Sequence, residues 1–132
     1  SFTTYALEYR NDARKFEVGT LALQDFAALN ASVELFLTLG PQEIERYIAR
    51  LAALVTEWAQ AHSRVRLLSP IPAEQRSGIV SLGFADTDRV ADALRSVGVA
   101  LSVREGAIRL ATHMFNTEDE LRKVFEVMER AP

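Results

Sequence analysis

The feature that most constrains the fold is an alternation of apolar residues with polar or small ones from Val99 to Ala111, interrupted once at Glu105-Gly106. A repeat of two residues is typical of a strand with one buried face, because successive side chains of a strand point to opposite faces of a sheet. A polar residue followed by glycine suits the two-residue loop of a β-hairpin. The segment therefore predicts two short antiparallel strands joined by a tight turn.

The register of this hairpin decides where its two arginines point. With Glu105-Gly106 as the turn, the expected facing pairs are Arg104 with Ala107, Val103 with Ile108, Ser102 with Arg109, and Leu101 with Leu110. Arg104 and Arg109 then share a face as diagonal neighbours, roughly 7–8 Å apart between backbones. Guanidinium groups bind carboxylates and phosphates bidentately, so the pair is a candidate anion clamp. The alternative is two solvated arginines on a wet face, and a slipped turn would separate them.

Composition narrows the class of protein. The chain has 132 residues, enough for one domain with a core, and it is 48% hydrophobic and 25% charged, as is ordinary for a globular protein. A net charge of −3 argues against nucleic-acid or anionic-membrane partners. No apolar run reaches the roughly 20 residues that span a bilayer, and nothing resembles a signal peptide. A cytoplasmic protein is therefore expected.

The inventory of reactive side chains excludes several chemistries. Without cysteine, the chain has no disulfide, no thiolate nucleophile and no zinc–thiolate site. His62 and His113 lie far apart in the sequence, and neither has a cluster of ligands beside it, so no metal site is expected. There is also no P-loop and no dinucleotide-binding glycine motif.

Two long helices are predicted ahead of the strands. Residues 21–39 have apolar side chains at helical spacing but only two charges, Asp25 and Glu34. Because an exposed helix normally carries more charge, we expect this one to be covered on more than one face, by this domain or by a partner. After Gly40-Pro41, residues 41–62 form an amphipathic pattern, in which Trp58 is expected to be a core residue.

The remaining patterns complete an α+β fold. Residues 65–68 and 77–84 are predicted strands, and a helix capped by Asp86 or Thr87 ends at Gly98. Its inward residues are expected to be Val90, Ala91, Leu94 and Val97. Thr117 with Glu120 forms a capping box for a last helix. The predicted order is α-α-β-β-α-β-β-α: two long helices, then a small mixed or antiparallel sheet of about four strands with helices on one face.

Several short motifs together resemble a known family. They are Phe16-Glu17-x-Gly19-Thr20, the run from Arg76 to Ser81, and Arg109-Leu110 followed by Phe115-Asn116-Thr117 and Glu120. Their order along the chain is similar to that in the C-terminal part of class V enzymes dependent on pyridoxal 5'-phosphate (PLP). This is the aminotransferase and cysteine-desulfurase superfamily of fold type I.

The resemblance implies roles for particular residues. Gly19 and Thr20 match the pair that contacts the cofactor phosphate, commonly across a dimer interface; without the resemblance, they would be a helix-entry turn. Arg109 matches the arginine that holds the substrate carboxylate, and Arg104 a second arginine often found upstream. Asn116 and Thr117 are interpreted as structural, because the capping box explains them.

The chain also departs from the family pattern. Lys15 replaces the usual arginine before the Gly-Thr motif, and the nucleophilic cysteine of the desulfurases is absent. This favours the aminotransferase, epimerase or kynureninase-like branches, where His113 would line the active site; a domain-interface role is the alternative for that residue. Neither Lys15 nor Lys123 is a credible Schiff-base lysine, so this chain alone is not expected to catalyse transamination.

The sequence thus predicts a segment of a larger enzyme. Residues 1–20 would be an extended segment carrying the phosphate-contacting motif, and residues 21–132 the small C-terminal domain. The N-terminal domain with the PLP lysine would be the missing partner, with a homodimer as the assembly and an amino acid as substrate. The alternatives are a stand-alone α+β binding module for a small carboxylate or protein partner, and a purely structural or dimerisation domain.

Overall fold

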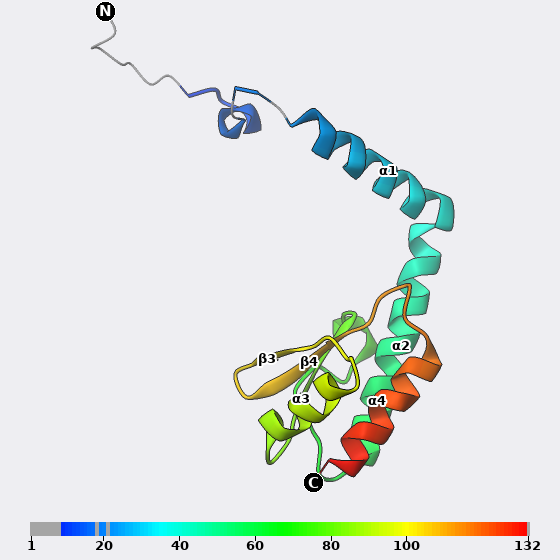
Figure 1. Ribbon diagram of the computed structural model, residues 1–132. Helices are drawn as coiled ribbons and strands as arrows, with labels where there is room; N and C mark the ends of the chain where they lie inside the picture. Colours follow the sequence, from blue (N-terminus) through cyan, green and yellow to red (C-terminus); the bar gives the residue numbers. More distant parts are fainter. Residues whose placement is uncertain (1–8, 18, 21, 132) are drawn as a thin grey trace, which may run out of the picture. The chain divides into compact units, whose positions relative to one another are not determined.

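A computed structural model describes residues 9–17, 19–20 and 22–131. The chain separates into two compact units, Ser1–Thr38 and Leu39–Pro132, which are described one at a time (Figure 1). Among the described residues, no helix is long and apolar enough to cross a membrane.

The first unit contains a short 3-10 helix, η1 (Ala13–Phe16), and nearly all of helix α1 (Leu23–Leu39). Asp12 caps η1, because its side chain accepts a hydrogen bond from Arg14 N at 3.0 Å. An irregular, extended segment was expected here, so the 3-10 turn is a local addition to it.

Helix α1 follows the predicted range closely. It begins at Leu23, and the predicted first residue, Leu21, lies outside the described residues. Every residue of α1 is exposed, including Phe26 and Leu29, which are 54% and 58% exposed. Within the first unit, the described residues therefore do not supply the cover expected for this charge-poor helix.

The second unit begins with helix α2 (Pro41–Ala61), as predicted. Gly40 precedes it with a φ of 86°, and Pro41 occupies the first turn, where no backbone N–H is needed. Its inward face is fully buried at Leu51 and Val55. Trp58 is half-buried and packs against the core, which confirms its expected position.

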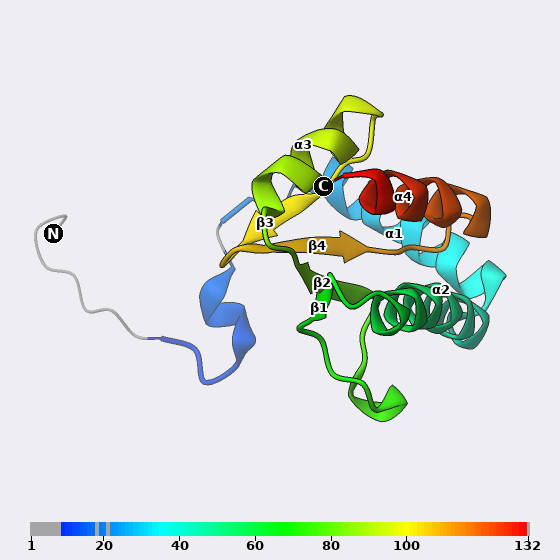
Figure 2. The same ribbon diagram turned by 90° about the horizontal axis from the view of Figure 1, so that it is seen from below.

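The sheet has four antiparallel strands in the order β1-β2-β4-β3 (Figure 2). Their bounds are β1 (Arg66–Leu67), β2 (Ile79–Gly83), β3 (Ser102–Arg104) and β4 (Ala107–Ala111), with a 3-10 turn, η2 (Ala73–Gln75), between β1 and β2. The predicted α+β fold class is confirmed, and of the two sheet types expected, the antiparallel one is present.

The β3–β4 hairpin has the predicted register, with Ser102 opposite Arg109, Val103 opposite Ile108 and Arg104 opposite Ala107. Glu105 and Gly106 both have positive φ angles, 52° and 72°, as a tight hairpin turn of primed type requires. The hydroxyl of Thr87 donates a hydrogen bond of 2.8 Å to Gly106 O, which ties the turn to the start of helix α3.

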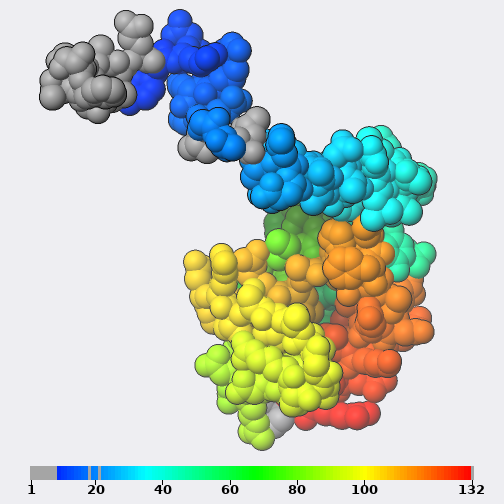
Figure 3. All heavy atoms as spheres, turned by 45° about the horizontal axis from the view of Figure 1, so that its top comes forward, coloured from blue at the N-terminus to red at the C-terminus, as the bar shows by residue number. Residues whose placement is uncertain are grey.

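Helices α3 (Thr87–Ser96) and α4 (Glu118–Arg130) have the predicted caps. Asp86 caps α3, Gly98 follows it with a φ of 85°, and Thr117 and Glu120 form the capping box of α4. Helix α3 packs against both β3 and α4, and the space-filling view shows α3 (yellow) beside α4 (orange to red) (Figure 3).

One predicted core residue is wrong. Val97 is 60% exposed and lines an open groove beside α4. The reason is that α3 ends at Ser96, so Val97 leaves the helical period that points Val90 and Leu94 inward.

The core lies between one face of the sheet and helices α2, α3 and α4. The strands contribute alternate residues to it, and its largest fully buried side chains are Leu51, Leu82, Leu94, Ile108, Val55, Val90 and Thr56. The opposite, arginine-bearing side is called the open face below; the residues of β2, β3 and β4 on it are Ile79, Ser81, Gly83, Ser102, Arg104, Ala107, Arg109 and Ala111.

Candidate anion-binding site

The open face brings Arg104 and Arg109 together. In the hairpin, Arg104 of β3 faces Ala107 of β4. Arg109 lies two residues beyond Ala107 on β4, so the two arginines are diagonal neighbours. Such neighbours have backbones roughly 7–8 Å apart, within reach of two long side chains. The geometry on which the clamp prediction depends is therefore present.

The two guanidinium groups have no acidic partner among the described residues. All the ion pairs in the described part of the chain involve other side chains, such as the pair of Arg95 and Asp92 on α3. Arg104 is exposed and Arg109 is half-buried, with the small polar residues Ser81 and Ser102 on either side of Arg109. Like charges this close repel, so an anion bound between them would be favoured.

The loop after β4 is shaped by Asn116 and Thr117. The Asn116 side-chain oxygen accepts a hydrogen bond from His113 N at 2.9 Å, and its carbonyl accepts one from the Tyr47 hydroxyl at 2.8 Å. Thr117 N donates a hydrogen bond of 2.8 Å to the Glu120 carboxylate, and this contact is the largest cause of the lowered pKa of Glu120. A second hydrogen bond to the same carboxylate, from the Asn116 side-chain amide, lowers the pKa further. These contacts agree with the interpretation of Asn116 and Thr117 as structural.

His113 lies in the loop that follows β4. It is half-buried, and its ring lies 4.7 Å from the exposed ring of Phe115, centroid to centroid. Among the described residues there is no group of three or more histidine, cysteine or acidic side chains that could hold a metal ion.

Gly19 and Thr20 lie in a bend ahead of α1, and both are exposed. A side chain built on Gly19 would meet no atom within 4 Å, and no hydrogen bond joins either residue to another described residue. A backbone N–H and a hydroxyl left available in this way fit a contact with a phosphate group.

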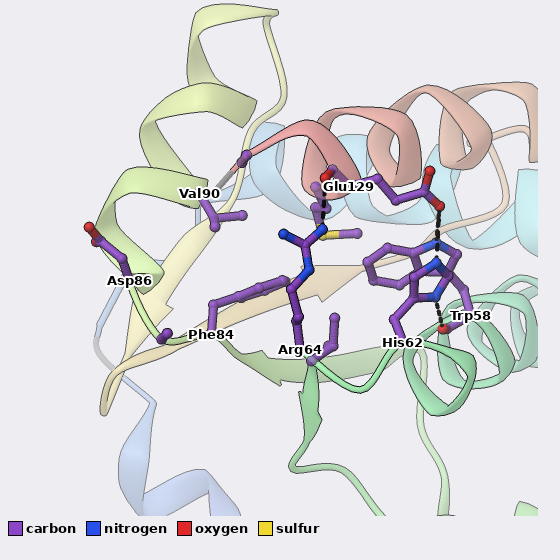
Figure 4. A pocket seen from close by; sticks show the side chains of 11 residues that line it. Trp58, His62, Arg64, Phe84, Asp86, Val90 and Glu129 are labelled. Atoms are coloured by element: carbon purple, nitrogen blue, oxygen red, sulfur yellow. Dashed lines mark hydrogen bonds and ion pairs between the residues drawn. The ribbon is translucent and has the colours of Figure 1, made fainter.

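A cavity on the helical side of the sheet was not expected from the sequence (Figure 4). It has a volume of about 170 Å³, and Phe84, Val90 and Met128 contribute to its lining. At one side, Glu129 Oε1 accepts a hydrogen bond of 3.0 Å from the Trp58 indole and lies 3.2 Å from His62 Nε2.

These contacts connect α2 to α4, and the cavity includes neither arginine of the open face. Trp58 near the end of α2 and His62 directly after the helix are four residues apart with stacked rings, which is the one local signal for the cluster. Their partner Glu129 is about 70 residues away in the sequence, so the cluster could not be assembled from spacing alone.

Comparison with known proteins places this geometry in context. The profile described as Aminotransferase class-V matches residues 2–127, nearly the whole chain. The chain belongs to the class V aminotransferase family. Among curated relatives, it is 28% identical over 118 residues to the uncharacterized aminotransferase YcbU of Bacillus subtilis, covering 89% of this chain. It is also 28% identical over 125 residues to Kynureninase 2 of Emericella nidulans, covering 88%.

Two solved structures show the same fold. The apo structure of a cysteine desulfurase from Thermococcus onnurineus superposes with a TM-score of 0.83 at 22% identity, over 98% of this chain and 35% of the other. A NifS-like protein gives a TM-score of 0.72 at 17% identity, over 93% and 38%. The chain spans 31% and 26% of the length of the two curated relatives, about a third of each or less.

Proposed function

We propose that residues 21–132 are the small C-terminal domain of a PLP-dependent class V enzyme that acts on an amino acid. In the complete protein, Arg109, assisted by Arg104, would hold the substrate carboxylate. Gly19 and Thr20 would contact the cofactor phosphate. The first 20 residues would carry this phosphate-contacting motif into a homodimer, and the protein would work in the cytoplasm.

The observation that carries this proposal is the hairpin register. It aligns Arg104 and Arg109 on the open face, and neither has an acidic partner among the described residues. The family membership supports an amino-acid substrate, whose carboxylate matches the charge and the planar geometry of a guanidinium group.

In this arrangement the domain positions the substrate. A bidentate contact from Arg109 fixes one end of the amino acid, which limits the angles at which its α-carbon meets the cofactor. When bound, PLP supplies an electron sink that stabilises negative charge at that carbon. The Schiff-base lysine and the aspartate that pairs with the cofactor ring are expected in the part of the enzyme that precedes this chain.

The phosphate contact is proposed on the availability of its donors. Thr20 would donate its hydroxyl and Gly19 its backbone N–H, and the absence of a side chain on Gly19 leaves room for the phosphate to approach. The isolated chain is therefore not expected to retain PLP, and it should not catalyse a reaction.

The test uses the full-length enzyme with its cofactor and the amino acid that it converts fastest in a panel. Arg109→Ala should raise KM by roughly 10- to 100-fold, because it removes a charge-assisted contact to the substrate. PLP content, measured by absorbance, should be unchanged. The matched control is Arg95→Ala, which removes an arginine paired with Asp92 on α3 and should leave KM as it was.

Two results would contradict the proposal. An unchanged KM in Arg109→Ala would remove its carboxylate role, and loss of PLP in the same variant would show a cofactor role instead. Thr20→Ala provides an independent check of the phosphate contact, because it should lower the affinity for PLP without changing KM at saturating cofactor.

The stand-alone binding module makes a different prediction. It requires that a chain of this length, purified from its own cells, lacks any covalently attached pyridoxyl group after borohydride reduction. A much longer native chain that carries a pyridoxyl-lysine adduct supports the enzyme proposal and opposes the module.

A further inference from the structure

A third arginine, Arg66 on the edge strand β1, also lies on the open face. It pairs with Gly83 of β2, and the Nε–Nη2 edge of its guanidinium group is turned toward that glycine. A Cβ built on Gly83 would be 3.2 Å from both Nε and Nη2 of Arg66, closer than side chains normally pack. Glycine at this position is therefore what lets the arginine lie across the neighbouring strand.

The register continues this row across the whole sheet. Gly83 pairs with Ala107, and Ala107 pairs with Arg104, so the row reads Arg66, Gly83, Ala107, Arg104. The two inner positions are the smallest residues available and both are buried, whereas the two arginines at the edges are exposed. The row therefore has a long charged side chain at each end and two small residues in the middle.

Arg109 lies beside the middle of this row. It is two residues from Ala107 on β4 and is paired with Ser81 of β2, which makes Gly83 its diagonal neighbour. The guanidinium group of Arg66 lies against Gly83, so it is on the opposite side of Arg109 from Arg104, the other diagonal neighbour. Arg109 is flanked by one arginine on each side.

The described residues provide no acidic partner for Arg66 either. Three guanidinium groups in this arrangement carry more charge than one carboxylate can neutralise. A single anion between Arg104 and Arg109 leaves Arg66 available for a second anion on the other side of Arg109.

We propose that Arg66 makes the site selective for amino acids that carry a second anionic group in the side chain. The inference rests on the proposed function, because it assigns the α-carboxylate to Arg109. Arg66 would bind the distal carboxylate. Gly83 acts as a positioning residue, because its lack of a side chain leaves room for the Arg66 guanidinium group against the sheet.

The experiment measures binding of succinate and butyrate to the full-length, PLP-loaded enzyme by calorimetry. The two acids have the same chain length and differ in the second carboxylate. The wild-type protein should bind succinate roughly 10- to 100-fold more tightly than butyrate, as expected for one additional charged hydrogen-bonded pair. Arg66→Gln should abolish that preference and leave butyrate binding unchanged.

Gly83→Ala provides a second variant that keeps all three arginines. Its added methyl group displaces the Arg66 guanidinium from the sheet, so the succinate preference should fall while the affinity for butyrate stays constant. The glycine has no positive φ, and the contacts nearest to the added atom are all to Arg66, so the fold should accept alanine. Arg95→Gln on α3 serves as the control for a lost surface arginine.

The outcomes separate this inference from the function on which it rests. A wild-type protein with no preference for succinate, or a preference that survives Arg66→Gln, would overturn the role of Arg66. If Arg109→Ala still weakens both acids in that case, the carboxylate role of Arg109 remains supported. If Arg109→Ala weakens neither acid, both the inference and the proposed function are wrong.

Discussion

The two faces of the sheet are built from alternate residues of the same strands, yet their surroundings differ completely. On the core face, Leu82 and Ile108 are fully buried beneath the helices. On the open face, one residue away along each strand, Ser81 and Arg109 are half-buried and polar. Because a strand alternates its side chains, a single pattern specifies both faces.

The core face contributes to folding stability, whereas the open face offers charge for binding a ligand. Residues of the core face are held by packing, so their loss should weaken folding. The arginines of the open face have no acidic partner among the described residues and contribute charge rather than packing. Substitutions on that face should change ligand affinity far more than the free energy of unfolding. The predictions below test this division with variants of the 132-residue chain.

The largest effect is expected for Leu82→Ala. The side chain is fully buried, so the substitution leaves a cavity and should lower the free energy of unfolding by about 2–5 kcal/mol. Urea denaturation followed by circular dichroism measures the change. The neighbouring Ser81→Ala, on the opposite face, should change it by less than about 0.5 kcal/mol. Equal losses in the two variants would contradict the division.

The hairpin turn, on which the separation of the two faces depends, should give the next largest effect. Gly106 has a φ of 72°, so Gly106→Ala should destabilise the chain by about 1–2 kcal/mol. Glu105 also has a positive φ, and Glu105→Asn should be neutral or stabilising, because asparagine tolerates this conformation better. Thermal unfolding compares the pair, and a loss in both variants would argue against the observed turn.

The parts of this fold that sequence patterns predicted are those governed by local rules. The hairpin register follows from the alternation on either side of Glu105-Gly106, and the α4 cap follows from Thr117 and Glu120 three residues apart. The ends of regular elements were less certain, as Val97 shows, because one residue beyond a helix end the period no longer applies.

Long-range features were not predictable in the same way. Arg66 meets Gly83 only because β1 and β2 pair across a connection of irregular residues, whose length does not fix a register. The contact of Trp58 with Glu129 likewise depends on how α2 and α4 pack. The roles proposed for Arg104 and Arg109 combine a register that the sequence predicts with the family motif around Arg109.

A smaller effect should come from Thr87, which connects the core side to the hairpin turn. Its hydroxyl donates to Gly106 O at 2.8 Å, so Thr87→Val should cost about 0.5–1.5 kcal/mol through the lost hydrogen bond. Thr87→Ser keeps the hydroxyl and should recover most of the loss. Hydrogen exchange at the amides of β3 and β4 should show faster opening in the valine variant. Unchanged exchange would indicate that the turn is held independently of α3.

The smallest effect is expected from lowering the pH. It should weaken helix α4 on the core side of the sheet and leave the arginines of the open face charged. The folded-state pKa of Glu120 is lowered, chiefly by the hydrogen bond from Thr117 N, so its ionised form stabilises the fold above its unfolded pKa. That contribution is lost as the pH falls through the lower, folded value.

Glu120→Gln keeps an oxygen for the capping box but cannot ionise. The excess stability of the wild-type chain over this variant should therefore shrink between pH 7 and about pH 3, below the roughly 4.3 of an unperturbed glutamate. Urea midpoints at the two pH values measure it, and an excess that is constant with pH would show that the charge of Glu120 does not contribute to the cap.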